Sequence, residues 1–494
     1  MIKRNLKLMC KLSAITFGVS LSLTSLASAS VNSRSYDYSN PIYSEGINDT
    51  FVYDNTDSVI TTKTGVQRTL PQVTGLYDIS SYPIPLTNRV PNEATFELIK
   101  AENKEIMDRV EEDIKNGTLT KHKAADGQFY GTVPDDALGV EKKIYINSNV
   151  KGTHSLASYV PAGEIATVTL NDEALKYAKQ GKIKLSVGMT MVDAEQYSHN
   201  HGSENRMPYL GKRFSISERE TKVGTPFGGM VFIEIADSIP SGTNIEVDIK
   251  GVVDTPYYDL GKTTAEEWKV AKDAPGVFAE IRTPYLRFIL PAKFIRHIED
   301  PQKAAEFWTN VTALSATAMG LENRTTPMTM TFDQYITVGI AYANVWGWSC
   351  NLPPEWAKDA FDYDGVVKNG SWGIIHEINH HYQRRYNNYS DEWGLGTDFT
   401  EITNNALSAA SYILYTNIAA SRGEEGTYDW NKVADPYSSL KQQIYEGVQY
   451  YPGVPNIGNF MFSTFAHEIG PINYVNVIKS TYEGGTFNGI YIPP

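Results

Sequence analysis

The residues best suited to do chemistry stand at His376-Glu377-Ile378-Asn379-His380, a His-Glu-x-x-His pattern. On a helix, positions i and i+4 lie on one face about a turn apart, so both imidazoles can bind one metal ion. Glu377 sits on a neighbouring edge of that face, from which a carboxylate can reach a metal-bound water without coordinating the ion. This is the arrangement that a zinc hydrolase needs, with Glu377 as general base.

A zinc site with two histidines needs a third protein ligand and one open position. The downstream carboxylates that could supply this ligand are Asp391, Glu392, Asp398 and Glu401. The first two lie in a polar segment that is typical of a loop. Glu401 opens a strongly helical run, with Thr400 as a suitable N-cap, and a helix holds a ligand more rigidly than a loop does. Asn405, one turn further on, can hydrogen-bond a ligand's ring nitrogen or carboxylate oxygen.

The pattern His-Glu-x-x-His, a spacer and then Glu-x-Thr-Asn-Asn on a helix resembles the enhancin-like zinc metallopeptidases of peptidase family M60. Two upstream stretches, residues 158–170 and 225–235, resemble the amino-terminal half of that family. The matching segments run from about residue 140 to near the end of the chain. The resemblance therefore rests on the motif and on its distant context together.

The resemblance implies a gluzincin site in which His376, His380 and Glu401 bind one Zn²⁺ and Glu377 is the catalytic base. It also implies a substrate class, because bacterial members of this family cleave mucins and other heavily O-glycosylated proteins. Tyr412 and His467 are distant candidates for the group that assists the oxyanion. In gluzincins a strand edge beside the zinc helix aligns an extended peptide, and residues 330–350 are the candidate for that strand by position.

The elements that must position this site indicate an α+β protein with a β-sandwich-like subdomain followed by a mainly helical, gluzincin-type catalytic domain. Residues 91–139 comprise a helix, 92–116, and a linker. Residues 140–255 contain short alternating β-rich runs broken by Gly, Pro and Asn, which predict the β-rich subdomain. The glycines of 226–230 indicate a close approach of two backbones. Residues 256–494 form the predicted catalytic domain, with helices at 301–321 and around the motif.

The amino-terminal region predicts export. Residues 1–29 carry a basic start, a short apolar core and a small-residue cleavage site, as a secretory signal peptide does. Its removal takes away four positive charges and no acids, so the net charge changes from −13 to −17. Such an acidic chain is a poor partner for nucleic acid or an anionic membrane, and no later stretch is apolar enough to insert in a membrane. Residues 30–90 are polar and indicate a weakly ordered leader.

Cysteine usage excludes an intrachain disulfide after export, because Cys10 belongs to the signal peptide and only Cys350 remains. Stability must therefore come from packed cores and a metal. His199 and His201 are two residues apart and suggest a second metal site, although a polar hairpin loop is the simpler interpretation. His381 is better explained as a structural residue than as a ligand.

Aromatic and basic residues near the motif offer two further interpretations. Four tryptophans gather around it in sequence, where they either stack on sugar rings or pack in a core; these are Trp346, Trp348, Trp372 and Trp393. Arg384 and Arg385 either contact glycan or lie at the exposed end of the helix. Three functions follow: a secreted zinc endopeptidase acting on O-glycosylated proteins, a zinc protease without a glycan requirement, and a non-catalytic glycan-binding or adhesion protein. The last has no use for Glu377.

Overall fold

The computed structural model describes residues 93–189 and 206–383, except for 320, 322, 325, 337, 338, 346, 365 and 367–370. It also describes Asn473, helical residues between 401 and 411, and the strands at 52–54, 59–61, 67–69, 203–204, 485–487 and 490–492. The predicted signal peptide lies outside these residues. Within the leader, β1 (Val52–Asp54), β2 (Val59–Thr61) and β3 (Gln67–Thr69) form a small antiparallel sheet that the sequence did not predict. No described helix is both long and apolar enough to span a membrane.

The first long element is helix α3 (Glu93–Asn116), within one residue of the predicted start and ending where predicted. Met107, Val110 and Ile114 are buried along one side, at the spacing of an amphipathic helix. Gly117 follows with φ +71°, a conformation that favours glycine and ends the helix. Residues 118–139, the linker, then cross to the next unit and contain only a short 3-10 turn, η2 (Ala125–Gly127).

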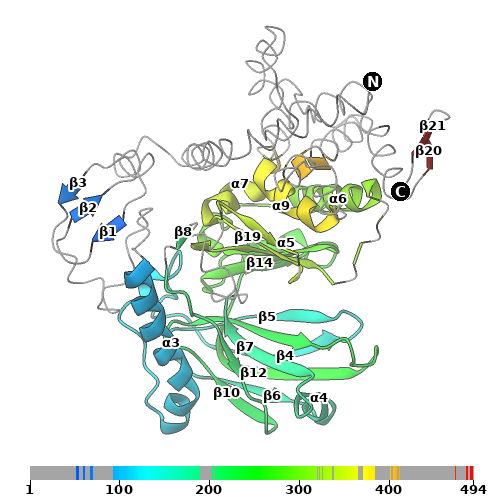
Figure 1. The fold of residues 1–494 in the computed structure, drawn as a ribbon. Coiled ribbons are helices and arrows are strands. Elements are labelled where there is room, and N and C mark those ends of the chain that lie inside the picture. The colour runs from blue at the N-terminus through cyan, green and yellow to red at the C-terminus, as the bar shows by residue number, and fades with distance from the viewer. Residues whose placement is uncertain are drawn as a thin grey trace.

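The β-rich unit contains an eight-stranded antiparallel sheet (Figure 1). Its strands are β4 (Val140–Asn147), β5 (Gly152–Val160), β6 (Ala166–Leu170), β7 (Ile183–Gly188), β9 (Lys212–Phe214), β10 (Glu220–Val223), β11 (Gly229–Ile235) and β12 (Asn244–Asp254), with helix α4 (Asp172–Ala178) after β6. The order is β10-β6-β12-β5-β11-β7-β9, and β4 also pairs with β12. Strand β12 joins the two halves of the sheet, since its earlier residues pair with β4 and β6 and its last residues pair with β5.

Two glycines allow the close contact that the sequence predicts around residues 226–230. A Cβ on Gly229 would lie 2.3 Å from Gly188 Cα, and one on Gly228 would lie 2.8 Å from the Val160 carbonyl oxygen. Both distances are far below any ordinary contact, so the backbones of β11, β7 and β5 meet here only because side chains are absent. The prediction of a close backbone approach is confirmed.

The second unit is built on a six-stranded mixed sheet in the order β13-β14-β15-β16-β19-β18. These strands are β13 (Tyr257–Asp259), β14 (Phe278–Arg282), β15 (Leu286–Pro291), β16 (Met328–Phe332), β18 (Tyr342–Asn344) and β19 (Ser349–Leu352). Helices α6 (Gln302–Ala318), α7 (Ala357–Ala360) and α9 (Trp372–Tyr382) lie on the sheet face that points away from the β-rich unit (Figure 1). Helix α5 (Ala265–Ala271) follows β13 and begins with a capping box at Thr264.

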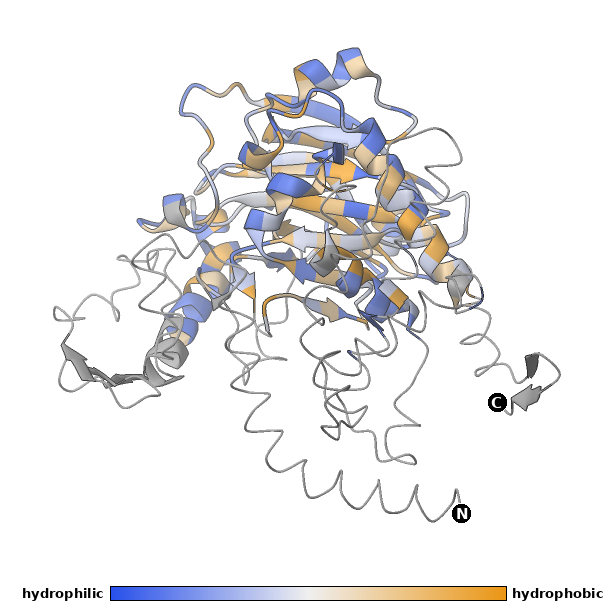
Figure 2. Cartoon of the chain, turned by 90° about the horizontal axis from the view of Figure 1, so that it is seen from above, coloured by the Kyte–Doolittle hydropathy of each residue, from blue (hydrophilic) through white to orange (hydrophobic). Residues whose placement is uncertain are grey.

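Each unit has its own hydrophobic core. The core of the second unit joins the sheet to α6 and α9 through large buried side chains such as Phe288, Phe307 and Trp308. Figure 2 shows helices of this region with hydrophobic and hydrophilic residues alternating around their axes, as expected for helices that cover a sheet on one side. The two units are also joined by a buried ion pair between Arg206 and Asp333, whose Nη2 and Oδ2 are 2.5 Å apart.

The α+β class is confirmed, but the mainly helical catalytic domain is not. The six strands of this sheet all precede α9 in the described part of residues 256–494. Strand β15 (Leu286–Pro291) is buried at every position and is a largely apolar run without alternation, interrupted only by Arg287. Periodicity alone does not distinguish such a run from a buried helix segment. Strand β16 is also fully buried, but its sequence alternates Met and Phe with Thr. Most of the sheet was therefore not predicted from the sequence.

Candidate metal centre

Helix α9 carries the His-Glu-x-x-His residues, and its apolar side fixes which way they face. Ile374, Ile375 and Ile378 are at most 1% exposed and belong to the core beneath the helix. His376 and His380 are therefore turned away from that core, onto a partly open side. Near the helix start, Gly373 allows close packing of Trp356, because a Cβ there would lie 2.2 Å from the indole ring. The strong burial of the isoleucines thus orients both imidazoles.

Glu401 joins the two histidines, as the sequence predicts. His376 Nε2 is 2.9 Å from Glu401 Oε2, His380 Nε2 is 3.5 Å from the same oxygen, and the two Nε2 atoms are 3.0 Å apart. Donor atoms around a tetrahedral zinc ion at about 2.0–2.1 Å are separated by about 3.3 Å. This separation is close to all three observed distances. The donor set of two imidazole nitrogens and one carboxylate oxygen therefore fits a zinc ion in both chemistry and spacing.

The outer nitrogens of both imidazoles have partners that leave the inner nitrogens available. His376 Nδ1 lies 2.7 Å from Asn405 Oδ1, and His380 Nδ1 lies 3.1 Å from Gln383 Oε1. A carbonyl oxygen only accepts, so each Nδ1 carries the proton and donates it. Each Nε2 therefore faces the shared centre and is the nitrogen that can bind a metal ion once it carries no proton. The structure places Asn405 beside a ring nitrogen of His376, as predicted. The contact of Gln383 with His380 was not predicted from the sequence.

The local charges explain how the three donors hold together. Burial by itself lowers the pKa of His376, but the hydrogen bond and charge of Glu401 outweigh it and raise that pKa to about 9. Burial alone raises the pKa of Glu401, and hydrogen bonds from the two imidazoles reverse this and hold it well below its usual range. The donors thus form an imidazolium–carboxylate pair, and a divalent cation that binds here takes the place of the proton.

Glu377 lies beside this centre and is not one of its donors. Its side chain is 6% exposed, and burial raises the pKa of its carboxyl while the neighbouring histidines lower it by less. A carboxyl whose pKa is raised above its usual value is better able to take a proton and then return it near neutral pH. Its position and environment therefore suit a general base.

Glu401 is held in place by a polar contact between helices. Residues Glu401, Asn404, Asn405, Leu407, Ser408 and Ser411 are helical and are called the Glu401 segment below. Their spacing places them mainly on one side of a helix. Asn404 Nδ2 donates to the His376 carbonyl oxygen at 2.8 Å, and Asn379 Nδ2 donates to Ser408 Oγ at 2.9 Å. Further along, Ser411 Oγ and Ser315 Oγ of α6 are 3.0 Å apart.

These contacts are buried, so they position Glu401 more firmly than surface contacts would. Asn379, Asn404, Ser408 and Ser411 are each 0% exposed. A buried polar group that loses its partner costs about 1–3 kcal/mol, which disfavours any other alignment of the segment against α9. The sequence shows Asn379 inside the His-Glu-x-x-His motif and the asparagines that follow Glu401. It does not show which residue each of them contacts.

His381 connects helix α9 to the sheet and is not one of the three donors. Its Nε2 lies 3.1 Å from the Ser349 carbonyl oxygen and 3.4 Å from Cys350 Sγ, so it ties α9 to strand β19. Burial lowers the pKa of His381 to about 3, which keeps the ring neutral. Trp348 packs edge-on against the same histidine, and the guanidinium of Arg324 lies 4.1 Å from the centre of its indole ring. Trp348 therefore serves packing, one of the two roles considered for the tryptophans.

Several predicted residues lie outside the described part of the chain or have no described side chain. They include the rival carboxylates Asp391, Glu392 and Asp398, the oxyanion candidates Tyr412 and His467, the pair His199 and His201, Arg384 and Arg385, and Trp346, Trp372 and Trp393. Among the described residues, the only cluster of three or more histidine, cysteine or acidic side chains that could hold a metal is His376, His380 and Glu401, with ligand atoms within 4.8 Å of one another.

Comparison with known proteins agrees with this site. A model of the family described as "Peptidase M60, enhancin and enhancin-like" matches residues 251–451, which include all three donors and Glu377. A second model, the N-terminal domain of M60-like peptidases, matches residues 137–250. The chain therefore belongs to the enhancin-like M60 peptidase family.

The relatives are longer than this chain. Antigenic protein P1 of Entamoeba histolytica is 33% identical over 400 residues, 77% of this chain and 34% of that protein. TRPM8 channel-associated factor 1 of Bos taurus is 27% identical over 324 residues, 64% of this chain and 32% of that protein. The chain thus spans about a third of the length of these relatives. Among solved structures, the IMPa metallopeptidase from Pseudomonas aeruginosa is 12% identical with a TM-score of 0.47, covering 89% of this chain and 57% of that one.

Proposed function

We propose that the chain is a secreted, zinc-dependent endopeptidase that hydrolyses peptide bonds in mucin-like O-glycosylated proteins. The observation that carries the proposal is the convergence of His376, His380 and Glu401 at one point, with Glu377 buried beside them. Membership of the M60 peptidase family supports the metallopeptidase. The glycoprotein substrate is supported by the resemblance of the His-Glu-x-x-His and Glu-x-Thr-Asn-Asn motifs to bacterial mucin-degrading members.

The residues of the chain suit peptide hydrolysis. His376, His380 and Glu401 would hold the zinc ion, which supplies Lewis acidity and lowers the pKa of a water. The Glu377 carboxylate accepts a proton from the water while the oxygen of that water attacks the scissile carbonyl. Glu377 then gives the proton to the leaving amine. Burial raises the pKa of Glu377, which makes its carboxylate a stronger base for the first of these transfers.

A sheet edge beside α9 can position the peptide. Strand β18 (Tyr342–Asn344) ends the six-stranded sheet, pairs with β19 alone among the strands that the structure describes, and packs near α9. It lies within the region 330–350 proposed from the sequence. An extended peptide that added to this edge would receive main-chain hydrogen bonds that do not depend on its sequence. Edge pairing therefore suits an endopeptidase whose selectivity resides in the side chains or glycans of the substrate.

Secretion is proposed from the sequence of residues 1–29, whose small-residue site predicts cleavage after Ala29. Amino-terminal sequencing of protein collected from the medium of an expressing bacterial culture tests this. The expected first residue is Ser30. An intact amino terminus on protein that stays with the cells would contradict the proposal.

The decisive experiment is digestion of one defined O-glycopeptide, followed by mass spectrometry. The mature chain is incubated with the glycopeptide, with the same peptide lacking glycan, and with the glycopeptide plus a chelator. Cleavage of the glycopeptide alone, abolished by the chelator and restored by zinc, is the expected result. Equal cleavage of the bare peptide would leave a zinc protease without a glycan requirement. Binding of the glycopeptide without cleavage by zinc-loaded protein would favour the non-catalytic alternative.

A further inference from the structure

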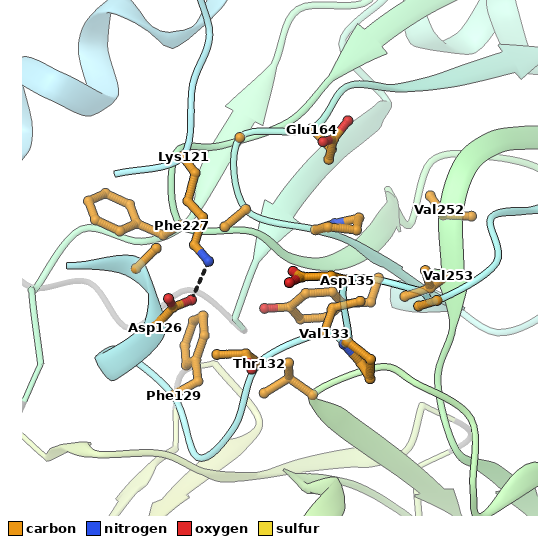
Figure 3. Close-up of a pocket in the computed structure, with 18 of the residues that line it drawn as sticks. Lys121, Asp126, Phe129, Thr132, Val133, Asp135, Glu164, Phe227, Val252 and Val253 are labelled. Atoms are coloured by element: carbon orange, nitrogen blue, oxygen red, sulfur yellow. Dashed lines mark ion pairs between the residues drawn. The ribbon is translucent and has the colours of Figure 1, made fainter. Parts of the chain in front are cut away.

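A cavity of about 650 Å³ lies in the β-rich unit, between the linker and one end of the sheet (Figure 3). It is lined by residues of the linker, the β5–β6 turn, the last part of β12, Phe227 and Val277. None of its lining residues comes from α9 or the Glu401 segment, so it is separate from the metal centre. Its volume falls within the range of about 300–1,000 Å³ that is usual for small-molecule sites.

The cavity has apolar walls that the backbone holds in place. Phe129 and Phe227 lie on one side and Val252 and Val253 on the other, and all four are buried (Figure 3). The linker is pressed against the β5–β6 turn at Gly163, where a Cβ would lie 2.1 Å from the Lys121 backbone nitrogen. Gly163 has φ +77°, a conformation that suits glycine. The wall formed by the linker is therefore part of the packed fold.

An unused hydroxyl group lies deep in this cavity. Tyr159 is 2% exposed and lines it, yet its hydroxyl makes no hydrogen bond with any residue that the structure describes. Described polar atoms that have no partner and no access to solvent do not include this oxygen. The hydroxyl oxygen is therefore accessible, and the cavity is the space that reaches it. Buried phenol hydroxyls usually have a partner. A ligand with a donor or acceptor at this depth would supply one.

The charges at the mouth select the kind of ligand. Lys121, the only cationic side chain that lines the cavity, pairs with Asp126 at 2.5 Å (Figure 3). Asp135 and Glu164 are exposed at the mouth and form no ion pair with a described residue. Carboxylates accept hydrogen bonds and repel anions, so a negatively charged ligand is disfavoured. A cation that entered fully would lose water with only a neutral phenol beside it, which is also costly.

We propose that this cavity binds a neutral saccharide of one or two residues. Sugar hydroxyls at the mouth would donate to Asp135 and Glu164, and a deeper hydroxyl would pair with Tyr159. The C–H faces of the sugar would contact the walls formed by Phe129 and Val252. The site is an ancillary carbohydrate-binding site, and it rests on neither the metal nor the proposed peptidase activity.

Isothermal titration calorimetry of the mature chain tests the proposal. The probes are lactose, N-acetyllactosamine and maltose as neutral saccharides, sialyllactose as an anionic one, and spermidine as a cation. Two pairs of variants locate any binding. Tyr159→Phe removes only the hydroxyl, and its control is Tyr145→Phe on an exposed, 68% accessible ring of β4. Gly139→Trp fills the mouth, and its control is Leu138→Trp at a neighbouring position that is 84% exposed and outside the lining.

The Trp variant is compatible with the backbone. A Cβ on Gly139 would meet only the Val252 carbonyl oxygen, at 3.7 Å, which is an ordinary contact. We expect at least one neutral saccharide to bind, with affinity abolished by Gly139→Trp and reduced about two- to tenfold by Tyr159→Phe, as loss of one hydrogen bond predicts. Both controls should bind as the unaltered chain does. Sialyllactose should bind more weakly than lactose.

Three results would overturn the proposal: no heat with any neutral saccharide, binding of spermidine alone, or saccharide binding that Gly139→Trp leaves intact. The same titration on the Glu377→Gln variant separates this proposal from the proposed function. Saccharide binding there should be unchanged, whether or not the chain proves to be a peptidase.

Discussion

The two halves of the metal centre are held in place by different forces. Helix α9, which carries His376 and His380, is anchored by buried isoleucines on its core side. The Glu401 segment contributes one described apolar side chain to that core, Leu407, and otherwise meets α9 and α6 through asparagine and serine contacts. Apolar burial is strong but non-directional, whereas buried hydrogen bonds fix alignment. We therefore expect α9 to contribute most of the folding stability of the centre and the Glu401 segment to set the alignment of Glu401.

The largest expected effect comes from Glu377, which α9 carries but which is not one of the three donors. Glu377→Gln keeps the side-chain shape and removes the base, so turnover of a cleavable peptide should fall about 10²–10⁴-fold while zinc remains bound. Steady-state kinetics and metal analysis of the same sample measure both. Glu173→Gln, on an exposed turn of α4, is the matched control. An unaffected rate would refute the assignment of the base.

Removal of the third ligand tests the polar half directly. Glu401→Ala leaves two imidazoles, so the protein should lose its zinc on dialysis while its fold, measured by circular dichroism, persists. Glu392→Ala is the informative comparison, because Glu392 was the rival in the sequence. Loss of zinc from that variant, with Glu401→Ala still loaded, would show that the wrong carboxylate was chosen.

The apolar half should respond in stability. Ile378→Ala creates a cavity at a 0% exposed position and should lower the free energy of unfolding by about 2–5 kcal/mol. The zinc affinity of the folded protein should change little, because the Nδ1 atoms of His376 and His380 are held by Asn405 and Gln383 and not by Ile378. Chemical denaturation and a competitive zinc titration measure the two quantities. A large drop in affinity with unchanged stability would reverse the proposed division between the halves.

Asn405→Ala should have the opposite profile. The variant removes the acceptor 2.7 Å from His376 Nδ1, so the imidazole loses its orientation and zinc affinity should fall about 10–100-fold. The midpoint of denaturation of the metal-free protein should move much less than in Ile378→Ala. If Asn405→Asp, which keeps an oxygen acceptor, failed to restore affinity, the hydrogen bond would not be the cause.

The smallest effect is expected at the serine pair between the Glu401 segment and α6. Ser315→Ala and Ser411→Ala should each cost about 1 kcal/mol of stability, because each leaves a buried hydroxyl without its partner across the interface. In the double variant the coupling energy should be about 0.5–1.5 kcal/mol. Additive losses would mean that the two hydroxyls, 3.0 Å apart, do not interact.

Prediction from sequence was most successful where the information is local. The four-residue spacing of His376 and His380 depends only on helix geometry, and the end of the first helix at residue 116 is equally local. It was least successful for the sheet of the second unit, where a fully buried strand such as β15 lacks alternation.

The sequence by itself determined the ligand types, the helix that carries two of them, and Glu401 as the carboxylate expected to supply the third. Only the tertiary structure decided how these residues are held, with Asn379 meeting Ser408 and His381 meeting Ser349. The cavity around Tyr159 was equally invisible in the sequence. Helix periodicity is a property of neighbouring residues, whereas contacts between residues tens of positions apart depend on how whole elements pack, and packing is settled by burial summed over the entire core.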